Sequence, residues 1–180
     1  MKYQRISQES EIKKLQTGVN KMAMAVGSTL GAKGRNVIID NDYASPTITK
    51  DGVTVARSIM LEDTLENMGA RLIKDVAHKT NEEAGDGTTT ATVLAASILN
   101  SGIRYVDSGS NPIFLKRGID KAVSKVVEKL KSISVSCSDI NTVTKVANVS
   151  ANNDEEIGKS ISFAIDKASK DGVITIQEAT

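Results

Sequence analysis

The sequence predicts a mainly α-helical protein that carries one small β-hairpin. Long segments repeat apolar residues every three or four positions, the spacing that places them on one face of a helix. Residues 36–49 instead hold two short β-prone runs around a polar turn, which is typical of a hairpin. With 180 residues, 39% of them hydrophobic, the chain is long enough for one domain and part of another.

The first helix is predicted over residues 12–26 and is followed by the hairpin. Its apolar face is formed by Ile12, Leu15, Val19, Met22 and Val26. The helix is expected to end at residues 29–31, because a glycine can end a helix at low cost. Residues 36–40 and 46–49 are predicted to be the two strands, projecting from a helical body.

Further helices are predicted after the hairpin. A short one over residues 53–58 precedes a long one over residues 62–83, which ends at the turn 85–87. The next begins at Thr88, and Asn111 before Pro112 marks the start of another. The apolar residues expected on their faces are Leu65, Met68, Leu72 and Val76, then Leu94, Ile98 and Tyr105, then Leu115, Ile119, Val123, Val126 and Leu130.

The C-terminal segment has a different texture. Residues 132–138 are predicted to be a connector, followed by helices over 139–148 and 154–170. Asn153 and Glu156 have the spacing of a capping box at the start of the second helix. Residues 173–176 are predicted to be a strand, and because a strand needs a partner, this portion is expected to be an incomplete unit.

Composition excludes several classes of function. The 23 basic and 22 acidic side chains give a net charge of +1, and aromatic residues are 3% of the chain, so no nucleic acid partner is expected. No apolar stretch approaches the roughly 20 residues of a membrane span. A single cysteine and an N-terminus without an apolar signal region favour a cytoplasmic protein that does not bind membranes.

Three glycine-containing turns carry the candidate chemistry: residues 29–34 (TLGAKG), 50–52 (KDG) and 85–90 (GDGTTT). In the third, glycines allow close backbone approach to a ligand, and the following helix start offers free N–H groups and a partial positive charge. A carboxylate beside a phosphate is favourable only with a cation between them, so Asp86 suggests bridging Mg²⁺. Taken singly, each turn is also a common structural motif, whereas together they favour a magnesium–nucleotide site.

The three turns closely resemble those of the group I chaperonins, the GroEL-like proteins. The resemblance rests on TLGxKGRN at residues 29–36, PTITKDGV at 46–53 and AGDGTTTATVL at 84–94. Further matches are ENMGA at 66–70, LKRGID at 115–120 and GVIT at 172–175, and the likeness runs from about Val19 to Thr180. It implies a chaperonin equatorial-domain-like helical bundle with a small β-hairpin, plus the start of an α/β intermediate domain.

On this resemblance, residues 1–134 are the N-terminal half of the equatorial, ATP-binding domain, and residues 135–180 are the first segment of the intermediate domain. The implied protein is a Mg²⁺-dependent ATPase that assists the folding of non-native proteins. Its implied partners are other subunits in a heptameric, commonly double, ring, together with a co-chaperonin and client proteins that bind an apical domain. The apical domain and the second half of the equatorial domain are absent from these residues, so the chain is expected to be a fragment with little activity of its own.

The resemblance also implies roles for individual residues. Asp51 is the expected catalytic carboxylate, which positions the attacking water, and Asp86 is the expected Mg²⁺ ligand. Lys50 is expected near the phosphates, where K⁺ is an optional further ion. The expected ATP-binding residues are Thr29, Leu30, Gly31, Ala32, Lys50, Asp86, Gly87, Thr88, Thr89 and Thr90. Ala32 stands where the family pattern has proline, which loosens the turn but leaves its backbone donors.

Two alternatives remain open at the level of sequence. The chain can be an assembly piece that keeps a subunit-contact surface but hydrolyses no ATP, because the hairpin exposes strand edges. It can also be an unrelated phosphate-binding enzyme such as a small kinase, although it lacks both a Walker A motif and a glycine-rich kinase loop.

Overall fold

The computed structural model describes residues 9–41, 44–137, 139–151, 153–168 and 173–175. The backbone divides into two compact units, Met1–Gly118 and Ile119–Thr180, and each is described by itself. This division falls within helix α5 (Pro112–Ile133). The assignment of residues 1–134 and 135–180 to an equatorial and an intermediate domain stays a prediction.

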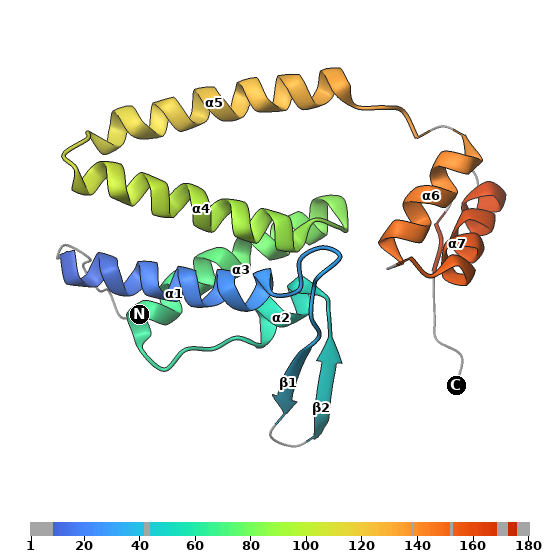
Figure 1. Cartoon of the computed structure of the whole chain (residues 1–180), viewed down its shortest axis with the longest axis horizontal. Helices are drawn as coiled ribbons and strands as arrows, with labels where there is room; N and C mark the ends of the chain where they lie inside the picture. Colours follow the sequence, from blue (N-terminus) through green and yellow to red (C-terminus); the bar gives the residue numbers. More distant parts are fainter. Residues whose placement is uncertain (1–8, 42–43, 138, 152, 169–172, 176–180) are drawn as a thin grey trace. The chain divides into compact units, whose positions relative to one another are not determined.

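The first unit is built on three long helices, α1 (Glu9–Gly27), α3 (Thr64–Ala84) and α4 (Thr88–Asp107), which pack against one another (Figure 1). The short helix α2 (Gly52–Ser58) contacts all three. The shared core is formed by Val19, Met22, Val26, Val55, Ala56, Ala70, Ile73, Ala77 and Ala96. The mainly helical fold and the buried centre of the first helix are therefore confirmed, whereas the predicted face residue Ile12 is exposed.

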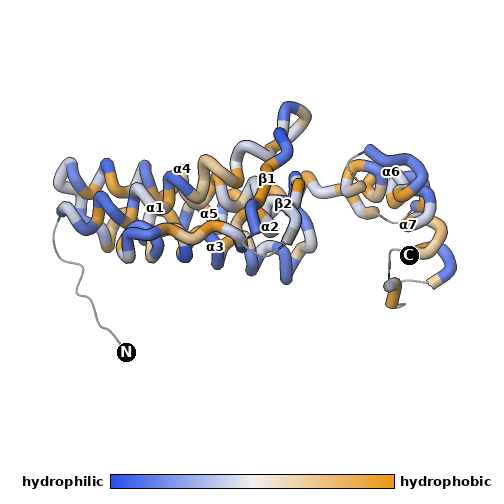
Figure 2. The backbone as a smooth tube through the Cα atoms, turned by 90° about the horizontal axis from the view of Figure 1, so that it is seen from below, coloured by the Kyte–Doolittle hydropathy of each residue, from blue (hydrophilic) through white to orange (hydrophobic). Residues whose placement is uncertain are grey.

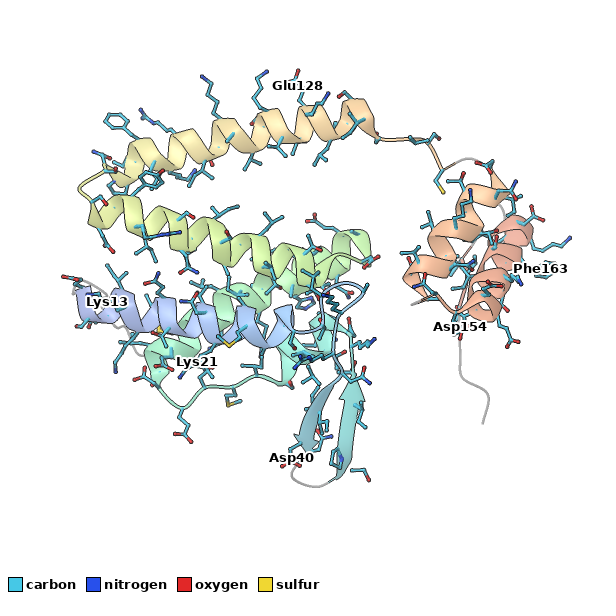
Figure 3. All side chains as sticks on the ribbon, viewed as in Figure 1. Lys13, Lys21, Asp40, Glu128, Asp154 and Phe163 are labelled. Carbon is cyan, nitrogen blue, oxygen red and sulfur yellow. The ribbon has the colours of Figure 1, made fainter. Side chains whose placement is uncertain are left out.

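Two glycines let α1 and α3 approach closely. A Cβ atom added to Gly18 would lie 1.8 Å from the carbonyl oxygen of Glu66, and one added to Gly69 would lie 2.0 Å from that of Leu15. Ion pairs flank the crossing, from Lys14 to Asp63 and from Lys21 to Glu66, each at 2.6 Å. Lys21 projects from α1 in Figure 3. Backbone contact thus replaces large side chains at this interface.

The predicted inner face of α3 is wrong in part. Leu65 is buried as expected, but Met68 and Leu72 are exposed. The buried positions are instead those of small residues beside Leu65 and Ile73, namely Gly69, Ala70 and Ala77. The physical reason is the glycine contact with α1, which turns the small-residue face of α3 inward and the large Met68 and Leu72 side chains outward.

The hairpin is confirmed. Strands β1 (Val37–Asn41) and β2 (Ala44–Thr49) pair antiparallel in a two-stranded sheet, with Val37 opposite Thr49 and an irregularity between Ile39 and Asn41. Ile38 and Ile48 form a cross-strand pair on an exposed face. The sheet therefore holds its shape by backbone pairing more than by core packing.

Helices α4 and α5 form as predicted, but their apolar faces are largely uncovered. The predicted face residues Leu94, Ile98 and Tyr105 of α4 are all exposed, and no residue of α5 is buried. Figure 2 shows apolar and polar positions alternating along the helices of the first unit. The helical period was thus correct for both helices, while the expectation of burial was not met.

In the second unit, α6 (Ile140–Ser150) packs against α7 (Glu155–Ala168). A hydroxyl pair, Thr144 and Ser162 at 2.5 Å, lies between the two helices. The predicted cap of α7 was displaced by one residue: Asp154, not Asn153, accepts hydrogen bonds from the first N–H groups of the helix.

The predicted C-terminal strand is not formed within the described residues. Residues 173–175 have no strand conformation, and the remaining predicted strand residue, Ile176, lies outside the described residues. Within the described ranges, no helix has the length and apolar character needed to cross a membrane.

Candidate functional site

The turn after α1 closes on itself through backbone hydrogen bonds. The amide of Arg35 donates to the carbonyl of Ser28 at 2.9 Å, and that of Gly34 donates to Gly31 at 2.9 Å. Gly31 has a φ of +70°, a conformation that favours glycine. A Cβ on Gly34 would lie 2.2 Å from the carbonyl oxygen of Thr29, so this glycine is required for the close approach. Steric limits therefore require glycine at both positions of this turn, at Gly31 because of its positive φ and at Gly34 because of the close approach to Thr29.

Asp51 caps α2 and fixes the start of that helix. One carboxylate oxygen, Oδ2, accepts hydrogen bonds from the Thr54 amide at 2.9 Å and the Thr54 hydroxyl at 2.5 Å. The other oxygen, Oδ1, has a longer contact of 3.4 Å with the Val53 amide. The Asp51 amide donates to the Thr49 hydroxyl, which connects the end of β2 to the cap.

The turn between α3 and α4 uses glycines at both sides of Asp86. Gly85 and Gly87 both have positive φ, +71° and +81°. Asp86 Oδ1 accepts the Gly87 amide at 2.6 Å, and its carboxylate is exposed. No side chain caps α4 within the part of the chain that the structure describes, so the first N–H groups of this helix stay available to a ligand.

The three turns meet at the threonines of α4. The hydroxyls of Thr29 and Thr89 lie 3.1 Å apart. A Cβ on Gly52 would lie 2.2 Å from Thr89 Oγ1 and 3.1 Å from Thr88 Oγ1. Segments separated by more than twenty residues of sequence therefore converge on one hydroxyl.

The hydroxyl pair has a defined direction. Thr29 donates its only hydroxyl proton to the Val26 carbonyl at 2.8 Å, so Thr89 must be the donor in the pair. A ligand that takes the Thr89 proton would have to replace this bond. Thr29 and Thr88 are buried, and Thr92 below them donates to the Thr88 carbonyl at 2.8 Å. We call the start of α4, with the hydroxyls of Thr88 and Thr89, the phosphate seat. Hydrogen bonds from Thr29 and Thr92 to backbone carbonyls hold its surroundings in place.

The structure brings together some of the predicted site residues and leaves others apart. Thr29, Thr88 and Thr89 converge, with Asp51 beside Gly52 at the same junction. Exposed residues that are not tied into this contact are Leu30, Gly31, Ala32, Lys50, Asp86 and Thr90. Their predicted roles in binding ATP or metal stay predictions, as does that of Gly87.

The sequence-based list of site residues leaves out Gly52, Gly34 and Thr54, although the two glycines belong to the turns that carry the candidate chemistry. Gly52 was visible as the residue after Asp51, and its meaning becomes clear only from its contact with Thr89. Thr54 stands three residues after Asp51, the spacing of an N-cap and its third helical residue, and this spacing was the available signal.

The residues present fit a phosphate ligand and a metal held jointly with it. A Cβ on Gly31 or Gly87 would meet nothing within 4 Å, so both turns face open space. The described residues contain no cluster of three or more His, Cys, Asp or Glu side chains that could hold a metal by themselves. A Mg²⁺ ion commonly takes one or two carboxylates and completes its shell with phosphate and water, so a single carboxylate such as that of Asp86 would be enough.

Comparison with solved structures gives similar folds among chaperonins. Two crystal forms of the chaperonin gp146 from the bacteriophage EL 2 (Pseudomonas aeruginosa), both in the presence of ATP-BeFx, match with TM-scores of 0.74 and 0.75. Identity is 30% and 31% over 91% and 93% of this chain. A group III chaperonin in the open state matches with a TM-score of 0.73 at 21% identity over 88% of the chain, which supports the fold alone.

The chain spans only about a third of the length of these structures, 29%, 30% and 32% of the three matched chains. A family model described as the TCP-1/cpn60 chaperonin family matches residues 22–178, nearly the whole chain. This match covers all three glycine-containing turns and most of each unit. The chain belongs to the TCP-1/cpn60 chaperonin family.

Proposed function

We propose that this chain supplies the phosphate-binding half of the Mg²⁺–ATP site of a group I chaperonin ATPase. The observation that carries the proposal is the convergence of the three turns on Thr89, through the Thr29 hydroxyl and the Gly52 backbone. The presence of ATP-BeFx in crystals of the phage chaperonin, 30% identical to this chain, supports a nucleotide as the ligand.

Each turn has a proposed task. The free N–H groups of α4 and the hydroxyls of residues 88–90 bind phosphate oxygens, as helix starts commonly do. The backbone of residues 29–32 lines the other side of the nucleotide. Lys50 adds positive charge near the phosphates, where K⁺ is an optional companion ion. Asp86 holds Mg²⁺ through the oxygen that its own turn leaves free.

The proposed reaction is transfer of the terminal phosphoryl group to water. Bound Mg²⁺ neutralises charge on the phosphate oxygens. Asp51 accepts a hydrogen bond from the attacking water and orients it, while the α4 N–H groups hold the phosphates in place. Positioning and charge neutralisation supply most of the acceleration in reactions of this kind.

The activity of the whole protein is also part of the proposal. We expect a cytoplasmic chaperonin whose subunits assemble into heptameric, commonly double, rings and act on non-native proteins with a co-chaperonin. Family membership and the shared fold support the chaperonin part of this proposal. Because the chain spans about a third of the matched chains, we expect weak nucleotide binding and little turnover from the chain by itself.

Titration calorimetry with Mg–ATP tests the site. Asp86→Ala should weaken binding about tenfold or more, because it removes the metal ligand while leaving the phosphate seat. Asp40→Ala, which removes an exposed carboxylate from β1 (Figure 3), is the matched control and should bind as the unchanged chain does. Tight binding that Asp86→Ala leaves unaltered would contradict the phosphate assignment.

A second candidate function is assembly without hydrolysis. It is favoured by the hairpin, whose Ile38 and Ile48 are exposed on a sheet of only two strands. Strand edges with apolar side chains recruit neighbouring chains. Light scattering separates this reading from the first: oligomers that dissociate in Ile48→Lys, in a chain that binds no Mg–ATP, would favour assembly alone.

A further inference from the structure

We propose that Thr54 is a positioning residue, which holds the Asp51 carboxylate so that one chosen oxygen, Oδ1, is presented to the reaction. This inference rests on the proposed function and deepens it. It concerns the orientation of a carboxylate, and Thr54 acts through its two hydrogen bonds to Asp51.

The two oxygens of Asp51 are used unequally. Both hydrogen bonds from Thr54, amide at 2.9 Å and hydroxyl at 2.5 Å, end on Oδ2. Among the described residues, Oδ1 has only the long 3.4 Å contact with the Val53 amide. A carboxylate oxygen can accept two hydrogen bonds, so Oδ2 is saturated and Oδ1 keeps acceptor capacity.

Other helix caps in the same chain show that this arrangement is not required for capping. Asp63 caps α3 with amide bonds to one oxygen and no hydroxyl donor from its own helix. Asp139 caps α6 with the same Asp-x-x-Thr spacing, but there the Thr142 amide bonds Oδ1 and the Thr142 hydroxyl bonds Oδ2. Thr142 therefore divides its two bonds between the oxygens of Asp139, whereas Thr54 places both of its bonds on one oxygen of Asp51 and leaves the other with the long Val53 contact.

The position of Asp51 gives this difference a function. Its neighbour Gly52 packs on the Thr89 hydroxyl, so the carboxylate is anchored beside the proposed phosphate seat. Without the Thr54 hydroxyl, the carboxylate would be held by backbone amides alone and could turn about its Cα–Cβ and Cβ–Cγ bonds, which would move the oxygen that Thr54 does not bond. A water molecule hydrogen-bonded to Oδ1 would then lose its fixed direction toward the phosphate, although the nucleotide would bind as before.

Valine and serine at position 54 separate the role of the hydroxyl from that of the side-chain shape. Thr54→Val removes the hydroxyl and keeps the amide bond to Oδ2, whereas Thr54→Ser keeps both donors. Thr142→Val makes the same change at the α6 cap and serves as the matched control. Thermal unfolding of all variants reports whether the helix starts survive.

The decisive measurement compares Mg–ADP with Mg–ADP–aluminium fluoride, a mimic that includes the attacking water, by titration calorimetry. Thr54→Val should bind the mimic about tenfold more weakly and bind ADP unchanged, since one hydrogen bond to a charged group is lost. Thr54→Ser should restore the mimic's affinity, and Thr142→Val should have no effect. Any turnover should fall in kcat at constant KM.

Several results would overturn the proposal. Equal losses for ADP and the mimic, no loss at all, or the same loss in Thr142→Val would each reduce Thr54 to an ordinary cap residue. A chain that binds ADP and the mimic equally well before substitution would also overturn it, since Asp51 would then face no water. If the Asp86→Ala comparison shows no specific nucleotide site, the proposed function fails first. If that site is present but Thr54→Val changes neither the affinity for ADP nor that for the mimic, only the inference about Thr54 fails.

A measurement without nucleotide completes the test. In the ligand-free chain, the Thr54 hydroxyl proton should be visible by NMR as a slowly exchanging signal, because it is held by Oδ2. Asp51→Ala should remove this protection. Rapid exchange in the unchanged chain would mean that the hydroxyl does not hold the carboxylate, and the inference would be wrong.

Discussion

Gly52→Ala is expected to damage the junction where the three turns meet. Gly52 is buried at the start of α2, and its backbone lies against the threonines of α4. An added Cβ would lie 2.2 Å from Thr89 Oγ1 and 3.3 Å from the Thr89 amide nitrogen, whereas ordinary contacts begin at 3.4 Å. The hydroxyl must therefore move by about 1.2 Å, and the hydrogen bond to Thr29 at 3.1 Å is lost.

The expected cost follows from these two effects. Overpacking a methyl group costs about 1–3 kcal/mol, and a hydrogen bond between neutral groups contributes about 1 kcal/mol. Because Thr89 can relieve part of the clash by rotating its side chain, we expect a loss of about 2 kcal/mol in the free energy of unfolding. Mg–ATP binding should weaken about tenfold or more, since the displaced hydroxyl and amide belong to the proposed phosphate seat.

Urea denaturation and titration calorimetry check both numbers. Gly102→Ala in α4 is the control, because its Cβ would be 3.8 Å from the nearest atom, Leu115 Cδ2. That variant should gain up to about 1 kcal/mol from helix propensity. In a Thr89→Ala background, Gly52→Ala should lose most of its cost, since the clashing oxygen is gone. If Gly52→Ala matches Gly102→Ala in stability and binding, or if its cost persists in the Thr89→Ala background, the contact does not act as described.

Two further predictions concern α1 and α3. Gly18→Ala and Gly69→Ala should each lower the free energy of unfolding by about 3 kcal/mol, because their Cβ atoms would meet backbone oxygens at 1.8 and 2.0 Å that cannot rotate away; urea midpoints no lower than that of the unchanged chain would contradict the close crossing. Hydrogen bonding to Lys14 lowers the pKa of Asp63 from its ordinary value of 3.8, so the stabilisation by the pair is present above that pH and is lost as the pH falls through the lowered value. Lys14→Ala should flatten this acid limb of stability measured by denaturation, and an unchanged limb would refute the linkage.

The features that sequence reasoning predicted correctly are local ones. The hairpin depends on two short runs and a turn, and the buried centre of α1 on Val19, Met22 and Val26 at helical spacing. The inner face of α3 depends instead on the contact between Gly18 and Glu66, which no local pattern contains. Apolar periodicity gives weight to large side chains, so it placed Met68 and Leu72 on the inner face, where the backbone contact with α1 instead favours glycine and alanine.

The candidate site divides in the same way. Each glycine turn could be recognised alone from its residues, and the chaperonin family from the three together. Their meeting point could not be predicted, because the contact of Gly52 with Thr89 depends on where α2 lies against α4. The unequal use of the two Asp51 oxygens could not be predicted either, since Asp139 has the same Asp-x-x-Thr spacing but a different pattern of hydrogen bonds.

Helix α5 shows what amphipathic spacing does and does not establish. The period of its apolar residues is helical, and the helix forms over Pro112–Ile133, yet Val123, Val126 and Leu130 are all exposed. Burial on one face requires a second surface, and that surface is a property of the partner and not of the helix. A correct period combined with an uncovered face therefore means that the sequence predicts which side of α5 needs a partner.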